Sequence, residues 1–122
     1  MQVYDKLHEL TGAVRQSEQY KRYMAAARAV SGNELYESMI RDFLAAQIEL
    51  SAMKMLGRQP DEDRIDNFNN LYASVSSIGE VNEFIQAQMA FSLMMDDITR
   101  EIASLTDTGF DFMKFNPGDF VY

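Results

Sequence analysis

The sequence predicts an all-α protein, an antiparallel helical bundle of three long helices and one short helix. Apolar residues recur at spacings of three and four along most of the chain before Gly109, which is the period of a helix face. Short segments containing Gly, Pro, Ser or Asn separate these patterns, and no stretch before Gly109 has the alternation of a half-buried strand. Short connections favour antiparallel neighbours. At 122 residues, the chain is expected to form one domain.

The first long helix is expected from about Val3 to Val30, because one apolar stripe keeps helical spacing through this range. Ser31 and Glu34 have the spacing of a capping box, in which a serine hydroxyl and a glutamate satisfy free N–H groups at a helix start. We therefore expect the chain to break after Val30 and to begin a new helix near Glu34.

The second long helix is expected from about Glu34 to Leu56. Gly57 and Pro60 should end it, since glycine readily adopts a left-handed conformation and proline cannot continue a helix. Asp61 is the expected N-cap of the short third helix. The second helix is apolar on more than one side, and the residues that widen its apolar face are Ile40, Leu44, Ile48 and Met55.

The longest helix is expected from Ser77 to Thr108, and Ser77 with Glu80 matches a second capping box. Its apolar face follows a heptad-like spacing. We call these positions the seam: Val81, Phe84, Gln88, Phe91, Met95, Ile98, Ile102 and Leu105. Further apolar residues widen this surface, so the helix should be covered on two sides; they are Ile85, Met89, Leu93 and Met94.

A homodimer is expected, formed through the seam and the second long helix. The broad apolar faces of these two helices exceed what one small bundle can cover, and two-fold dimers are the commonest oligomers. Gln88 is the strongly polar residue of the seam. We expect it to fix the register of helix pairing by a hydrogen bond, as polar residues at core heptad positions do.

The chain is expected to divide into an all-α domain, residues 1–108, and an aromatic tail, residues 109–122. An Asn-Pro-Gly turn interrupts the tail at Asn116. The tail is predicted either to pack on its own bundle or dimer mate, to dock another protein, or to fray. Its aromatic residues are Phe110, Phe112, Phe115, Phe120 and Tyr122.

The net charge of −8 is concentrated in the second half of the chain. Residues 1–58 carry eight Lys or Arg and seven Asp or Glu, whereas residues 59–122 carry three and twelve. An acidic chain without a concentrated basic patch is not expected to bind nucleic acid directly. No uncharged run reaches the length of a membrane span, and the N-terminal residues do not have the pattern of a signal peptide.

Little in the sequence supports catalysis. Cysteine is absent, which removes disulfides and thiolate chemistry and fits a cytoplasmic location. His8 is the sole histidine of the chain, so paired Glu-x-x-His metal motifs cannot form within it. No glycine-rich phosphate loop or nucleophile elbow occurs. We expect no catalytic, cofactor-binding or metal-binding residues.

Several short segments, taken together and in order, resemble the YlbF/YmcA/YheA family over about residues 2–106. They are Tyr4-Asp5-Lys6, Ser17-Glu18-Gln19-Tyr20-Lys21, Asp42-Phe43 with Gln47, Gly57-x-x-Pro60, Glu83-Phe84-Ile85-Gln86-Ala87 and Asp97-Ile98. The resemblance implies a small, all-α, self-associating cytoplasmic bacterial protein without a known catalytic site.

Some members of that family act with a partner protein in a complex that modulates RNase Y-dependent mRNA processing, competence, sporulation and biofilm formation. Those members hold iron–sulfur clusters through cysteines, and this chain has none. It therefore resembles the cysteine-free, YheA-like branch. The resemblance implies a non-catalytic regulatory adaptor that acts through protein–protein interaction. A structural, self-assembling helical module without a regulatory partner is the alternative.

Overall fold

The computed structural model describes residues 2–107, and this part of the chain is helical throughout, without strands. The elements are α1 (Gln2–Gln16), α2 (Glu18–Val30), α3 (Glu34–Met55), α4 (Glu62–Ser76), α5 (Gly79–Ala103) and the 3-10 helix η1 (Ser104–Asp107). The all-α prediction is confirmed for these residues.

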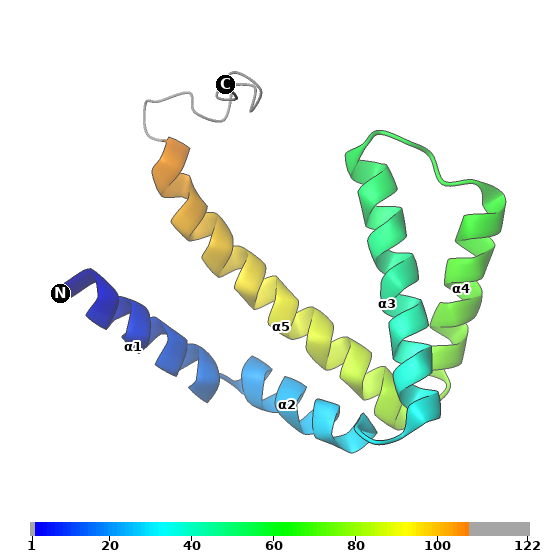
Figure 1. Cartoon of the computed structure of the whole chain (residues 1–122), viewed down its shortest axis with the longest axis horizontal. Coiled ribbons are helices and arrows are strands. Elements are labelled where there is room, and N and C mark those ends of the chain that lie inside the picture. Colours follow the sequence, from blue (N-terminus) through cyan, green and yellow to red (C-terminus); the bar gives the residue numbers. More distant parts are fainter. Residues whose placement is uncertain (1, 108–122) are drawn as a thin grey trace, which may run out of the picture.

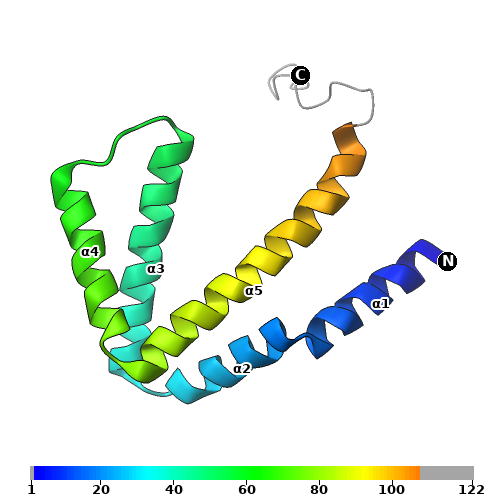
Figure 2. The same cartoon turned by 180° about the vertical axis from the view of Figure 1, so that it is seen from behind.

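The helices form a V rather than one closed bundle (Figures 1 and 2). One arm consists of α5 with α1 and α2 along it, and the other arm is the hairpin of α3 and α4. The arms meet where α2 ends, α3 begins, α4 ends and α5 begins. The expected bundle of three long helices and one short helix therefore needs correction: the described chain has five α-helices in two antiparallel layers that diverge from one corner.

The core lies at this corner, which we call the vertex. Its buried cluster takes residues from four helices, α2 to α5, so the vertex joins both arms. Helix α1 has no buried residue and adds nothing to the cluster. Burial of large apolar side chains is the main stabilising contribution to such a fold, so the vertex holds the V together. The cluster is Val30, Ile40, Phe43, Val75, Val81 and Ile85.

The expected single helix from Val3 to Val30 is in fact two helices that separate at Ser17. Ser17 has extended backbone angles and is the N-cap of α2. Its Oγ accepts a hydrogen bond from the Tyr20 N–H at 3.2 Å and donates one to the Val14 carbonyl at 2.6 Å. The serine side chain thus replaces backbone bonds that a continuous helix would make, an alternative that apolar spacing alone does not reveal.

Replacing Ser17 with alanine should lower the free energy of unfolding by about 1 kcal/mol, because the α2 start loses its side-chain cap. Ser17→Asp is the matched control, since its carboxylate can still accept the Tyr20 N–H and should retain most of the stability. Urea denaturation followed by circular dichroism measures both variants. Equal losses for alanine and aspartate would contradict the capping role.

Two predicted helix boundaries are confirmed. Gly57 follows α3 with φ of 70°, the left-handed conformation expected there. Asp61 is the N-cap of α4, and its side chain accepts from the Arg64 backbone N–H at 2.8 Å. Arg64 also bridges α4 to α3, because its guanidinium pairs with both Asp61 and Glu49.

Both predicted capping boxes are wrong. Asn33, rather than Ser31, caps α3 and accepts from the Tyr36 N–H at 3.0 Å. Ser77 belongs to the end of α4, where its hydroxyl donates to the Ser74 carbonyl at 2.7 Å, and α5 begins after Ile78 without a side-chain cap. At α3 the neighbouring Asn33 caps the helix instead of Ser31, and at α5 the Ser77 hydroxyl bonds the end of the preceding helix instead. The spacing of a capping box does not reveal such competing hydrogen bonds.

Candidate protein-interaction surfaces

Two apolar stripes begin in the vertex and continue outward, one along each arm. On α5, residues spaced by four lose burial with distance from the vertex: Val81 is 0% exposed, Ile85 1%, Met89 44% and Leu93 63%. Residues at this spacing are neighbours on one side of a helix. We call these four residues the α5 stripe.

Apolar residues on α3 show the same gradient of exposure. We call them the α3 stripe: Ile40, Leu44, Ile48 and Met55. Ile40 is 7% exposed and Leu44 packs against the vertex cluster, whereas Ile48 is 68% and Met55 88% exposed. Single exposed apolar residues are ordinary on protein surfaces, but contiguous apolar stripes mark interaction sites. The α3 and α5 stripes, together the arm stripes, are therefore the first candidate site.

The inner half of the seam packs within its own chain. Val81 lies in the vertex cluster, and Phe84 and Phe91 lie against the α2 aromatic residues. The Tyr23 ring is 5.6 Å from Phe84 and 5.3 Å from Phe91, between ring centroids, and Tyr20 is 5.7 Å from Phe91. This half of the seam is occupied by α2, and self-association through the seam stays a prediction.

Gln88, the polar residue of the seam, bonds within α5. Its Nε2 donates to the Ser92 Oγ at 3.0 Å, and both side chains are half-buried. This bond within α5 uses one N–H of the Gln88 amide. It does not test whether Gln88 fixes the register of helix pairing, and that role stays a prediction.

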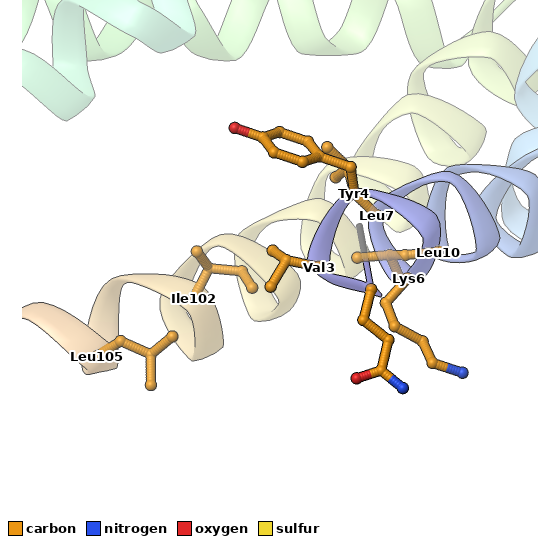
Figure 3. Close-up of a pocket in the computed structure, with 8 residues that line it drawn as sticks. Val3, Tyr4, Lys6, Leu7, Leu10, Ile102 and Leu105 are labelled. Atoms are coloured by element: carbon orange, nitrogen blue, oxygen red, sulfur yellow. The ribbon is translucent and has the colours of Figure 1, made fainter.

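The outer half of the seam lines an apolar groove between α1 and α5 (Figure 3). Two adjoining cavities, of about 850 Å³ and 440 Å³, share Leu7, Leu10 and Ile102, so they form one trough. Val3 and Ile102 point toward one another across it (Figure 3). The remaining seam residues Met95, Ile98 and Leu105 also line this α1–α5 groove.

Sequence reasoning missed the groove because it treated α1 and α2 as one packed helix. The signal was present in the apolar spacing of Val3, Leu7 and Leu10 ahead of the polar Ser17. Once the helix breaks, α1 no longer follows α2 onto the core, and these three apolar residues stay 36–75% exposed. The five tail aromatics, which the sequence predicts to pack on the bundle, to dock another protein or to fray, lie outside the described residues.

An exposed ion pair links α2 to α5. Arg22 donates from Nε and Nη2 to the two Glu83 carboxylate oxygens at 2.8 and 2.7 Å. These hydrogen bonds hold the pKa of Glu83 below its ordinary value and raise the pKa of Arg22. The side chains are 45% and 48% exposed, so solvent screening keeps the contribution to stability small.

Because the pKa of Glu83 is lowered in the folded state, the pair should stabilise the protein above the unfolded pKa of glutamate, about 4.3. That stability should be lost as pH falls through the lower folded pKa. Thermal melts of wild type and Glu83→Gln, measured from neutral pH into the acid range, test this. The difference in Tm between wild type and Glu83→Gln should become smaller as the pH falls. A difference that grows in acid would contradict a lowered pKa of Glu83 in the folded state.

The described residues show no ready site for metal chemistry. From residue 2 to residue 107, no three histidine, aspartate or glutamate side chains converge closely enough to hold a metal ion. None of the helices in that range is long and apolar enough to span a membrane. What the geometry does offer is apolar surface on two arms and in one groove.

These features define an all-α protein with apolar surfaces suited to contact with other helices. The chain belongs to the family described as "Control of competence regulator ComK, YlbF/YmcA", whose sequence model matches residues 3–105. This confirms the resemblance noted from the short sequence segments.

Bacterial relatives match over most of their length. A UPF0342 protein of Caldicellulosiruptor bescii is 30% identical over 101 residues, which cover 83% of this chain and 85% of the relative. One from Caldicellulosiruptor saccharolyticus is 28% identical over 105 residues, covering 86% and 88%. A UPF0342 protein of Symbiobacterium thermophilum is 26% identical over 112 residues, covering 92% and 100%.

A solved structure supports the fold. The crystal structure of Bacillus subtilis RicA in complex with RicF superposes with a TM-score of 0.51, covering 87% of this chain and 94% of that chain. The sequence identity is 17%, so the likeness concerns the arrangement of helices.

Proposed function

We propose that this protein is a non-catalytic regulatory adaptor that works by protein–protein contact through the arm stripes. The observation that carries the proposal is the burial gradient, from 0% to 63% exposed along the α5 stripe and from 7% to 88% along the α3 stripe. The stripes continue the core outward, and covering them would extend the vertex along both arms.

In this proposal a second copy of the chain covers the stripes, and a regulatory partner competes with that copy for the same surface. Each arm alone leaves its stripe open to water, and burial of apolar area drives association. Membership of a family described by control of a competence regulator supports a regulatory role, and the RicA–RicF complex shows that a protein with this fold binds another protein. We propose that the adaptor acts in the cytoplasm. The processes we propose for it are competence, mRNA processing, sporulation and biofilm formation.

Affinity isolation from native extract, followed by quantitative mass spectrometry, tests the adaptor role. The baits are wild type, Leu93→Asp and Asn70→Asp. Both variants add one negative charge, but Asn70 is exposed on α4 outside either stripe. Wild type and Asn70→Asp should recover one partner protein at fixed stoichiometry, and Leu93→Asp should lose it.

Two results would contradict this proposal in different ways. Recovery of the partner by Leu93→Asp at the wild-type level would remove the arm stripes as the binding site. Recovery of nothing except further copies of the chain would favour a structural, self-assembling module, which the same stripes can support.

A further inference from the structure

The α1–α5 groove is a second apolar surface, separate from the arm stripes, and it opens where the described chain ends. Ile102 of α5 and Leu105 of η1 line it on one side, and Val3, Leu7 and Leu10 of α1 line it on the other. Gln2 and Lys6 are the polar residues lining its larger cavity. Such a surface suits aromatic or aliphatic side chains.

We propose that the groove binds the chain's own residues 109–122. This segment begins four residues after Leu105, which itself lines the groove. It carries five aromatic residues, the side chains that bury the largest apolar area. The inference is independent of the adaptor role, because it concerns a different surface.

The lengths are compatible. Val3 to Leu10 spans about 10 Å along α1, at about 1.5 Å per helical residue. An extended chain covers about 3.3 Å per residue, so the six residues from Phe110 to Phe115 reach about 20 Å. The segment can therefore turn back from η1 and follow the groove, with two further aromatics after Phe115.

Tethering favours this occupant over a second copy or a separate protein. A segment joined to the groove by a few residues has an effective concentration of the order of millimolar. A separate chain must also lose translational and rotational freedom on binding. Covering the groove would bury the α1 apolar residues, which the vertex leaves exposed.

The absence of natural cysteine allows a direct test in the full-length chain. Tyr4→Cys, at the groove, is combined in turn with Phe112→Cys, Phe115→Cys or Phe120→Cys, and a short bismaleimide links the thiols. The control combines Asp66→Cys, exposed on α4 of the other arm, with the same tail positions. Leu7→Cys is a second groove position in case Tyr4→Cys does not fold.

At least one groove pair should form an intramolecular crosslink about tenfold or more faster than its Asp66→Cys control, as expected for a tethered ligand. Equal rates at all three tail positions would overturn the proposal. Products that link two chains, rather than one, would assign the groove to a second copy and would overturn it as well.

A second measurement does not depend on crosslinking geometry. The single variant Leu7→Cys is labelled with a maleimide reagent in the full-length chain, with the tail intact or with Phe112, Phe115 and Phe120 replaced by serine. Labelling should become several-fold faster when the aromatics are removed. An unchanged rate would show that the tail does not cover the groove.

Discussion

Phe43→Ala should lower the free energy of unfolding by about 3–5 kcal/mol, the usual cost of removing a buried phenylalanine. Phe43 is 1% exposed at the vertex. Its ring lies 5.3 Å from Phe68 and 6.0 Å from Tyr72, between centroids, so it joins α3 to α4 inside the cluster. The free energy of unfolding of a small domain is about 5–15 kcal/mol in total. This one change should therefore remove a large part of the stability.

Urea denaturation at a fixed protein concentration measures this effect, because association adds to apparent stability. Ile65→Ala, at a residue of α4 that is 42% exposed, is the control and should cost under about 1.5 kcal/mol. If the two variants unfold at the same urea concentration, the vertex is not the core that holds the arms.

Leu93→Asp should weaken self-association by about 2 kcal/mol or more, which is about 30-fold in Kd. A carboxylate on the α5 stripe would have to be buried without a partner when the second copy binds, and that desolvation is costly. Leu93 is 63% exposed within the protomer, so the fold itself should tolerate the change.

Sedimentation equilibrium of wild type, Leu93→Asp and Asn70→Asp measures this difference, with circular dichroism to show that all three fold. The Asn70→Asp control should associate as wild type does, because it changes net charge equally but lies off the stripes. A Leu93→Asp protein with unchanged Kd would contradict a contact through the α5 stripe.

The sequence predicts the helices better than their arrangement. Apolar spacing and local chemistry at Gly57 and Asp61 locate α3 and α4, because these signals act within a few residues. The break at Ser17 escapes this reasoning, since a serine can occupy a stripe position or cap a new helix with equal ease in sequence.

Which neighbour covers a helix face cannot be read from periodicity. The seam of α5 looks like a dimer surface in sequence, yet Tyr20 and Tyr23 of α2 occupy its inner half. Met89 and Leu93, which only widen the apolar face in the sequence pattern, are left exposed. A pattern reports that a face is apolar, whereas tertiary contacts decide whether that face is core or interface.

Hydrogen exchange on the unaltered protein at high and low concentration tests the central claim, that the arm stripes are contact surfaces. Dilution below the Kd should speed amide exchange in residues 44–55 of α3 and 86–96 of α5, and should leave residues 62–70 of α4 unchanged. Exchange that is insensitive to dilution in both stripes, or a change confined to α4, would contradict the account.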